Sequence, residues 1–449
     1  MSRKSRTSAH SMPAILLGDP WVSQVHRHDY ARTQMVFATG HDLFSSAALD
    51  VGTSRLLRTL AAKDGPLAKA REVLDLGCGT GILGLSLARG LPEGQVRVTQ
   101  SDRDRLAVHL SRLNAAANGL GSAPERLTVL DAGPGYAPCR DSGAGPFDLI
   151  VQNVPAKAGR SGLRELLFGA GPLLRPGGVV AFVHVAPLTP TIDELREEFA
   201  EEHGGLATVK ESAGKEHRAL HWRFEKGLPL PDHLSPLDPW QREDVEEELH
   251  LRGMKPIPHV AVHDVEEFDS EHYRTTLMVR LAERERPVRD GQSDRLLLFN
   301  PCHGFLAARF LSERRLSEIA LSGRDTLELA VARTNISAVL GQWSLDDCTS
   351  LGEATALPSR PWLPAEETPE NRGFDLIAGP LLWKEGPAAH AETLTALKNA
   401  LSTEPKGLLI LSVGAGQLDT LRKIALKVGL RCGRELKKKG TAAICLRRR

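Results

Sequence analysis

The segment Val73-Leu-Asp-Leu-Gly-Cys-Gly-Thr-Gly-Ile-Leu-Gly84 has the residue types best suited to hold a small molecule. Its pattern predicts a buried strand that runs into a glycine loop and then into a helix. Glycine lacks a Cβ, so the backbone can approach a ligand closely, and the first turn of a helix offers free N–H groups. The spacing Gly79-x-Gly81-x-x-Gly84 fits a dinucleotide fingerprint, but Asp75 would repel a pyrophosphate. The acid favours a ligand with positive charge, and a purely structural tight turn is the alternative.

A second segment, Phe147-Asp-Leu-Ile-Val-Gln-Asn-Val-Pro-Ala156, ends in residues suited to group transfer onto an amine. An exocyclic amine is a poor nucleophile because its lone pair is delocalised into the ring. An asparagine side-chain oxygen and a backbone carbonyl can together accept both amine hydrogens, which turns the lone pair toward an electrophile. Asn153 and Val154 would supply these two acceptors, and Pro155 would hold the turn rigid. A structural turn at Asn153 is the alternative.

Two further acids follow predicted strands. Asp102 closes the second strand, about 20 residues past the last glycine, where an acid can accept hydrogen bonds from both hydroxyls of a ribose. Asp131 follows the third strand. Asp102 is alternatively a helix cap, and Asp131 is alternatively a turn residue before Gly133-Pro-Gly135.

The elements that must position these residues are short apolar runs that alternate with helical stretches, the signature of a parallel sheet. Strands are predicted at residues 73–76, 96–100, 127–130, 149–152 and 179–183, and helices at 83–89, 105–118 and 163–174. An acidic helix follows, and then a terminal hairpin at residues 206–210 and 220–224. The sequence therefore predicts a mostly parallel α/β domain.

The second half of the chain repeats the first. Residues 101–114 align without a gap on residues 322–335, and Phe147-Asp-Leu-Ile150 recurs as Phe374-Asp-Leu-Ile377. The pairs His41-Asp42 and His263-Asp264 precede the two copies at a similar distance. Because the matches keep their order and spacing, we infer an internal duplication.

The second copy lacks the chemistry of the first. We align Phe299 with Asp75, and the glycine loop is expected to shrink to Pro301-Cys-His-Gly304. Gly323 replaces Asp102, and Pro380 replaces Asn153. These losses predict a retained fold without an active site, which either docks substrate or braces the first copy.

The motifs point to a known family. Asp75-x-Gly77-x-Gly79-x-Gly81 resembles motif I of class I S-adenosylmethionine-dependent methyltransferases, and Asn153-Val-Pro-Ala156 resembles their amino-group motif IV, usually Asn-Pro-Pro-aromatic. Residues 36–57 resemble the N-terminal segment of the methyltransferase small domain family, and the resemblance covers about residues 30–190. That family includes tandem-domain ribosomal RNA guanine-N2 methyltransferases, in which the degenerate copy comes first rather than second.

The resemblance implies a fold and a site. The fold is α/β, with two tandem Rossmann-like class I methyltransferase domains on mostly parallel seven-stranded sheets. The resemblance implies catalytic roles for Asn153, Val154 and Pro155, and it implies S-adenosylmethionine as the cofactor. In the family, Asp102 would bind the ribose and Asp131 the adenine amino group. The other cofactor-binding residues would be Asp75, Gly77, Cys78, Gly79, Gly81 and Asn153. Phe44, Asp50, Gly52 and Thr53 would close over the cofactor and substrate, and no metal is required. Ala156 and Val154 depart from motif IV, so a stacking ring would come from elsewhere, such as Phe44 or Tyr30.

The implied activity is methyl transfer from S-adenosylmethionine to an amine nitrogen, first of all an exocyclic base amine of RNA such as guanine N2 of ribosomal RNA. A protein or small-molecule amine is the alternative, and a non-catalytic scaffold is a third. The C-terminal residues 431–449 carry eight basic residues and one acid, which is either an edge strand with a solvated tail or a phosphate-contacting patch.

Composition agrees with a globular protein of two or three domains: 449 residues, 41% hydrophobic, with 57 Lys+Arg against 56 Asp+Glu. The six scattered cysteines argue against disulfides and structural zinc, and the absence of an apolar leader or a long apolar run favours a cytoplasmic protein without membrane contact. We predict a solvated N-terminal arm at 1–32, a catalytic domain at 33–226, a Pro-rich linker at 227–240 and a degenerate domain at 241–449. The oligomeric state stays open.

Overall fold

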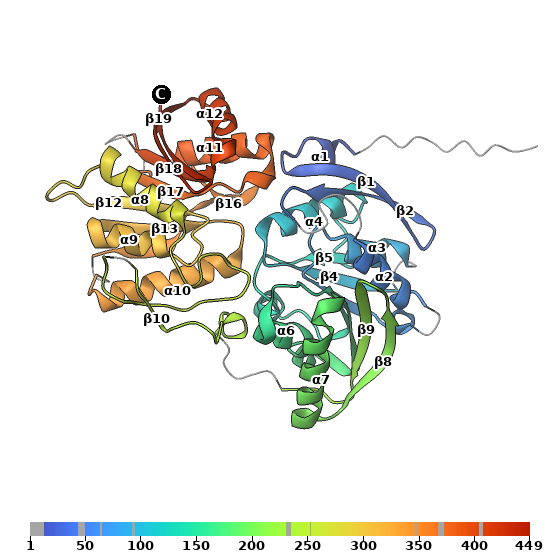
Figure 1. Ribbon diagram of the computed structural model, residues 1–449. Coiled ribbons are helices and arrows are strands. Elements are labelled where there is room, and N and C mark those ends of the chain that lie inside the picture. Colours follow the sequence, from blue (N-terminus) through green and yellow to red (C-terminus); the bar gives the residue numbers. More distant parts are fainter. Residues whose placement is uncertain are drawn as a thin grey trace, which may run out of the picture.

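The computed structural model describes residues 13–43, 50–62, 65–91, 95–229, 235–251, 253–345, 348–366, 372–403 and 407–449. Within these ranges the chain forms two α/β halves, each built on a mostly parallel seven-stranded sheet. Figure 1 shows the first half in blue and green and the second half in yellow and red. The predicted fold class, two tandem Rossmann-like domains, is confirmed.

The first sheet has the strand order β5-β4-β3-β6-β7-β9-β8. Five strands are parallel, and β9 pairs antiparallel with β7 and β8, so the predicted terminal hairpin is confirmed. The strands are β3 (Glu72–Leu76), β4 (Arg97–Ser101), β5 (Leu127–Val129), β6 (Phe147–Asn153), β7 (Leu174–Val185), β8 (Leu206–Ala213) and β9 (His217–Phe224). The second sheet repeats this order as β14-β13-β12-β17-β18-β20-β19. Its strands are β12 (Asp294–Phe299), β13 (Leu316–Ser322), β14 (Ser350–Glu353), β17 (Leu376–Pro380), β18 (Leu408–Gly414), β19 (Leu430–Lys438) and β20 (Thr441–Arg448).

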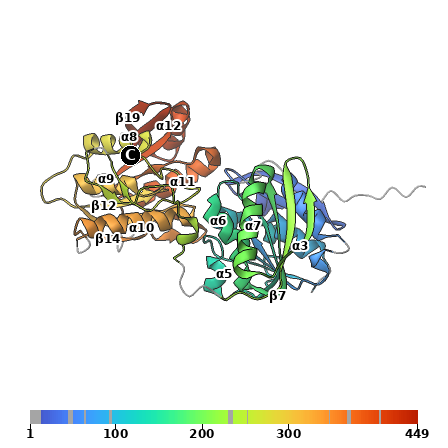
Figure 2. The ribbon, with the colours of Figure 1, turned by 60° about the horizontal axis from the view of Figure 1, so that its bottom comes forward.

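Helices cover both faces of each sheet, which is why the central strands are mostly apolar and buried. On the first sheet one face carries α2 (Val51–Leu60), α3 (Ile82–Gly90) and α4 (Arg105–Ala117), and the other carries α5 (Ala137–Ser142), α6 (Gly159–Phe168) and α7 (Thr189–His203). On the second sheet one face carries α8 (Tyr273–Glu285), α9 (Phe305–Glu313) and α10 (Thr326–Gln342), and the other carries α11 (Pro387–Ala400) and α12 (Leu418–Lys427). Figure 2 shows helices in front of the first sheet from a second direction.

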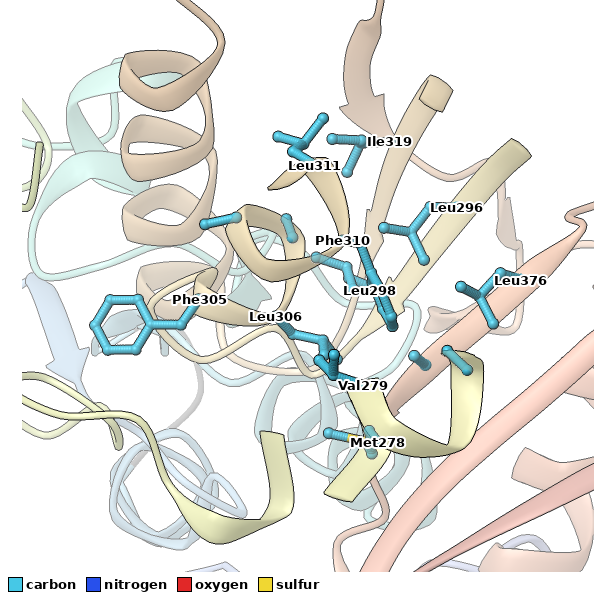
Figure 3. Close-up of a cluster of buried hydrophobic side chains, with 14 of the residues drawn as sticks. Met278, Val279, Leu296, Leu298, Phe305, Leu306, Phe310, Leu311, Ile319 and Leu376 are labelled. Atoms are coloured by element: carbon cyan, nitrogen blue, oxygen red, sulfur yellow. The ribbon is translucent and has the colours of Figure 1, made fainter. Parts of the chain in front are cut away.

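The core of the second half is made by side chains of β12 against α8 and α9. Leu296 and Leu298 of β12 are fully buried against Phe310 of α9 and Met278 of α8, as Figure 3 shows. The apolar cluster on this face of the second sheet is therefore made within the second half.

One helix boundary differs from the expectation. The helix predicted at 163–174 instead spans Gly159–Phe168 and is followed by the short 3-10 helix η2 (Gly171–Leu173). Pro172 stands at the start of η2, and a proline disfavours a helical conformation in the residue before it. The proline explains why the helix ends early.

The predicted solvated arm is wrong for residues 14–32. This stretch forms the short helix α1 (Ala14–Leu17) and strand β1 (Val22–Tyr30), which pairs antiparallel with β2 (Thr33–Gly40). Trp21 is fully buried, and its ring lies edge-on to that of Trp362 in the second half, with ring centroids 5.2 Å apart. The polar composition of the segment hides this contact because the ring partner, Trp362, lies more than 300 positions away.

Each half contributes an equivalent tryptophan to the core of the other. Trp240 closes the 3-10 helix η4 (Asp238–Trp240) and belongs to the apolar cluster of the first half, whereas Trp21 belongs to that of the second. His41 N donates to Trp21 O at 3.1 Å, and His263 N donates to Trp240 O at 2.8 Å. The duplicated His-Asp pairs thus follow equivalent anchor points, and η4 lies at the end of the predicted linker.

Helices α4 and α10 also pack reciprocally, because each contributes side chains to the apolar core of the other half. Leu106 and Leu110 of α4 pack in a cluster of the second half, and Leu327 and Val331 of α10 pack in a cluster of the first. In the gapless alignment of the copies, Leu106 matches Leu327 and Leu110 matches Val331. The two halves therefore pack through a duplicated, reciprocal interface.

The structure corrects our alignment of the glycine loop with the second copy. Leu76 pairs with Ser101 in the first sheet, and Phe299 pairs with Ser322, the counterpart of Ser101, in the second. Phe299 therefore corresponds to Leu76, Leu298 corresponds to Asp75, and the loop has kept its length. The sequence alignment paired the strand residues one position out of register and placed a deletion in a loop that has none. The carboxylate is still absent from the second copy, because Leu298 stands in its place.

The basic C-terminus forms the edge hairpin β19–β20 rather than a free tail. Arg447 Nη2 donates to Glu285 O at 2.9 Å, and Arg448 Nη2 donates to the carbonyls of Asn399 at 2.8 Å and Leu401 at 2.6 Å. These carbonyls lie at the C-terminal ends of α8 and α11, where cations are favoured. Both guanidinium groups are thus used within the fold.

The remaining described elements are small. They are β10 (Glu248–Leu249), β11 (Ile257–Pro258), β15 (Ala356–Leu357), β16 (Arg360–Pro364), η1 (Pro66–Ala68), η3 (Ala186–Leu188), η5 (Trp383–Glu385) and η6 (Ala415–Gln417). Among the described residues, every helix is too short or too polar to cross a membrane.

Candidate active site

A cavity of about 520 Å³ lies at the carboxyl ends of β3, β4 and β6, the edge at which doubly wound sheets bind ligands. Most of the residues predicted for the site line it. They are Asp50, Thr53, Asp75, Gly77, Cys78, Gly79, Asp102, Asn153, Val154 and Pro155. The structure thus brings together four separate segments of the sequence.

The glycine loop forms an open cradle on one side of the cavity. Gly77 and Gly79 have φ angles of +66° and +54°, a region that side chains rarely adopt. A Cβ added to either residue would meet no atom within 4 Å. The loop therefore needs glycine for its backbone conformation, and the space next to it is free for a ligand. Gly81 instead begins α3 and packs close to the side chain of Ser111.

Asp75 is buried at the base of the cradle. Its Oδ2 accepts from Gly84 N at 2.8 Å and from Gln100 Nε2 at 3.0 Å, which ties the strand to the first turn of α3. Burial raises the pKa of Asp75 to about 6, although both hydrogen bonds act in the opposite direction. A cation bound in the cavity would favour the ionised form.

Asp102 is the second carboxylate next to the cradle. Its Oδ2 accepts from Gly79 N at 2.8 Å, and its Oδ1 accepts from Asp104 N at 2.9 Å. Burial again raises the pKa to about 6. The cap of α4 is Asp104, which accepts from Leu106 N at 2.8 Å, so Asp102 is not the helix cap.

Asn153 ends β6 with its side-chain amide fixed in one orientation. Its Nδ2 donates to Asp50 Oδ2 at 2.9 Å and to Thr53 Oγ1 at 3.2 Å. No described residue donates to its Oδ1. Val154 N donates to Val183 O at 2.9 Å, which fixes the peptide that follows. The arrangement leaves a side-chain acceptor available at the cavity wall.

Asp50 and Thr53, from the segment before β3, line the cavity and also position Asn153. Asp50 is the N-cap of α2 and accepts from Thr53 N at 2.9 Å with the same Oδ2 that holds Asn153. Gly52 does not line the cavity, and a Cβ there would lie 2.8 Å from Asp50 Oδ2. Phe44, which we expected over the pocket, lies outside the described residues.

Two other expected contacts are not found at the cavity. The side chain of Asp131 is 97% exposed and pairs with Arg112 at 2.7 Å. Tyr30 packs on Gly90 in an apolar cluster away from the cavity. Two rings that our sequence reasoning missed, Phe37 and Trp240, do line it.

The second half also reaches this cavity through Asp264. Its Oδ2 pairs with Arg103 Nη2 at 2.7 Å, and both residues line the wall next to Asp102. The duplicated His-Asp pair was the signal in the sequence that could have revealed Asp264. Trp240 gave no such signal, because it lies in the segment interpreted as a linker.

The corresponding place in the second half is filled by its own side chains. Cys302, the counterpart of Gly79, receives a contact from Arg274 Nη2 at 3.1 Å on its sulfur. Its backbone N donates to Glu328 Oε1 at 2.6 Å, so Glu328 takes over the bond that Asp102 makes in the first copy. Pro380 occupies the place of Asn153 in the sheet register. In the second half, a cysteine side chain therefore replaces an open glycine position, and a proline replaces the asparagine amide.

The chain is similar to several known proteins. The model of the methyltransferase small domain matches residues 34–211. The ribosomal RNA small subunit methyltransferase C of Pseudomonas entomophila is 38% identical over 145 residues, which are 31% of this chain and 39% of that protein. The tRNA1(Val) (adenine(37)-N6)-methyltransferase of Aeromonas hydrophila is 32% identical over 208 residues, which are 43% of this chain and 82% of that protein.

Among solved structures, the T. thermophilus 16S rRNA N2 G1207 methyltransferase, in complex with AdoMet and guanosine, matches with a TM-score of 0.61. The match covers 95% of this chain and 98% of that chain at 17% identity, so it carries the tandem fold alone. The chain spans 39% and 46% of the lengths of the first two curated relatives. The matched family model and the Aeromonas relative, most of whose length is covered, identify the chain as a member of the methyltransferase small domain family.

Proposed function

We propose that the protein is an S-adenosylmethionine-dependent methyltransferase whose acceptor is an exocyclic base amine of RNA. The observation that carries the proposal is the fixed amide of Asn153, with Nδ2 bound to Asp50 and Thr53 and Oδ1 available at the cavity wall. Oδ1 and the carbonyl of Val154 accept the two amine hydrogens and turn the nitrogen lone pair toward the methyl group.

The cavity fits the cofactor. The cradle of Gly77 and Gly79 leaves open space, and the carboxylates of Asp75 and Asp102 line the same cavity. When bound, S-adenosylmethionine supplies an electrophilic methyl group on a cationic sulfonium. Asp102 would accept from the ribose hydroxyls, and Asp75 would contribute negative charge toward the cationic cofactor. Positioning of the two reactants does most of the catalytic work, because the chain needs no nucleophile of its own.

The first candidate acceptor is guanine N2 of small-subunit ribosomal RNA. Support comes from the curated relatives and from Lys157, an exposed cation at the cavity beside Ala156 that suits a phosphate contact. Adenine N6 of RNA is the second candidate, because the Aeromonas relative is named for that reaction. A protein or small-molecule amine is the third, favoured by Ala156, which leaves motif IV without its aromatic ring.

We also keep the predicted division of the chain as a proposal: a catalytic domain at 33–226, a linker at 227–240 and a degenerate domain at 241–449. The role in RNA modification would take place in the cytoplasm.

Radiolabelled S-adenosylmethionine, offered with separate pools of total RNA, total protein and small metabolites, tests the proposal. The RNA comes from a strain that lacks this protein, so that its own target is unmodified. Label in RNA is expected, and nucleoside mapping then separates guanine N2 from adenine N6. Label confined to protein or metabolites would contradict the RNA assignment, and a wild-type protein that binds no S-adenosylmethionine would contradict the proposal as a whole.

A further inference from the structure

The loop after β4, which carries Asp102 into the cavity, is bonded directly to the second half. Thr326 N and Oγ1 both donate to Arg103 O, at 3.1 Å and 2.9 Å. Arg105 N donates to Arg324 O at 3.0 Å, and Asp104 and Asp325 form an antiparallel bridge. The backbone on the C-terminal side of Asp102 therefore takes its position from the second copy.

The side chain of Arg103 is also held from the second half. Its Nη2 pairs with Asp264 Oδ2 at 2.7 Å and with Asp325 Oδ2 at 3.1 Å. Arg103, Asp264 and their neighbour Asp102 line the same cavity. Two carboxylates on one guanidinium leave it little freedom, and a fixed guanidinium plane is a good surface for an aromatic base.

Trp240 lies at the same end of the cavity. A Cβ on Gly135, in the loop after β5, would be 3.3 Å from Trp240 Cζ2, and one on Gly162 of α6 would be 3.0 Å from Cε3 and Cζ3. The indole thus packs closely on two glycines of the first half. Gly135, Trp240 and Arg103 all line the cavity, so this end has one aromatic wall and one cationic wall.

We propose that the second copy, with the segment leading into it, completes the cofactor site by holding Arg103 and supplying Trp240 as walls for the adenine ring. The inference rests on the proposed function, because it takes Asp102 as the ribose acceptor. Gly133 and Gly135, in the loop after β5, line the cavity and would border the adenine. The degenerate copy is retained because the binding site is incomplete without it.

The test measures the affinity of the full-length protein for S-adenosylmethionine and for methylthioadenosine, which carries the adenosine end only. Asp264→Asn keeps the shape and tolerates the left-handed backbone at this position, where φ is +62°. It should weaken both ligands about fivefold. Trp240→Ala should weaken both by about 5- to 150-fold, because stacking of a base on an aromatic ring contributes about 1–3 kcal/mol, and Trp240→Phe should restore most of the loss.

Two variants of the same interface serve as controls. Arg360→Gln breaks the ion pair with Asp19 at 2.9 Å, and Trp21→Phe trims the tryptophan equivalent to Trp240; neither residue lines the cavity. Both should bind S-adenosylmethionine as the wild type does. Melting curves for all variants separate lost binding from lost folding.

A double variant tests whether Asp264 acts through Arg103. Arg103→Gln should weaken binding, and adding Asp264→Asn should cause no further loss. Wild-type affinity in both Trp240→Ala and Asp264→Asn, or an equal loss in the controls, would overturn the inference alone. A wild-type protein that binds neither ligand would overturn the proposed function together with it.

Discussion

Replacing Asp50 separates the orientation of the Asn153 amide from the capping of helix α2. One oxygen, Asp50 Oδ2, accepts from Thr53 N at 2.9 Å and from Asn153 Nδ2 at 2.9 Å. Serine caps helices as well as aspartate does, but its oxygen lies one bond closer to the backbone. Asp50→Ser therefore keeps the cap and loses the bond to Asn153, whereas Asp50→Ala loses both.

The size of the effect follows from the bonds involved. A hydrogen bond to a charged group contributes about 1.5–3 kcal/mol, which corresponds to about 10- to 150-fold in rate if the orientation of the amide controls transfer. Asn153 Nδ2 keeps its bond to Thr53 Oγ1 at 3.2 Å, so we expect Asp50→Ser at the lower end, about tenfold. Thr53→Val removes the neutral bond and should cost about fivefold. Asp50→Ala should also lower the free energy of unfolding by about 1 kcal/mol.

The assay is single-turnover methyl transfer at saturating S-adenosylmethionine, with cofactor affinity and melting measured in parallel. We expect the order of loss Asn153→Ala, Asp50→Ser, Thr53→Val, with cofactor affinity changed little in the last two. Wild-type transfer by Asp50→Ser, together with an inactive Asn153→Ala, would refute the claim that Asp50 orients the amide. A parallel loss of cofactor affinity would refute it too.

Three further predictions concern the cradle, its charges and the interface. Gly79→Ala should lower the free energy of unfolding by about 1 kcal/mol and weaken the affinity for S-adenosylmethionine at least about tenfold. Gly177→Ala, also at positive φ with open space but outside the cavity, should lower only the stability. Calorimetric titration and melting compare the two variants, and equal affinities would contradict the role of the cradle. Because burial raises the pKa values of Asp75 and Asp102 to about 6, their contribution to the stability of the unliganded protein is complete below about pH 4 and is lost as the pH rises through about 6. The cationic cofactor binds the ionised forms, so its affinity should be full above pH 7 and fall as the pH drops below 6; constant affinity from pH 8 to 5 would contradict this. Arg324 pairs with Asp104 at 2.6 Å and with Glu385 at 2.8 Å. Arg324→Leu removes this shared partner and should lower the free energy of unfolding by about 3–5 kcal/mol, measured as a shift of the urea midpoint.

The strands and the glycine loop were predictable because their signals are local. A buried parallel strand is apolar along its length, and the turn at Gly77 and Gly79 needs residues that accept positive φ. Asn153 was found because its chemistry and its place at a strand end agree. The role of Asp50 was predicted only as part of a lid, since nothing local tells which side chain its carboxylate meets.

The reciprocal packing of the halves was not predictable from periodicity. Trp21 lies in a polar stretch and Trp240 at the end of a Pro-rich one, and each is buried by residues of the other half. The duplicated His-Asp pairs were visible in the sequence, but nothing local tells that Asp264 reaches across the interface to the cavity of the first half. The position of Asp131 after a strand suggested a ligand contact. In the structure its side chain is exposed and pairs with Arg112, a contact that the local sequence does not indicate.

The most direct test of the central claim compares wild-type protein with Asn153→Ala on RNA from a strain that lacks the protein. Both should bind S-adenosylmethionine, and nucleoside mass spectrometry should find methylated guanosine at its exocyclic nitrogen only after incubation with the wild type. Methyl transfer to the same nucleoside by Asn153→Ala at an undiminished rate would contradict the account, because the acceptor on which it depends would then be dispensable.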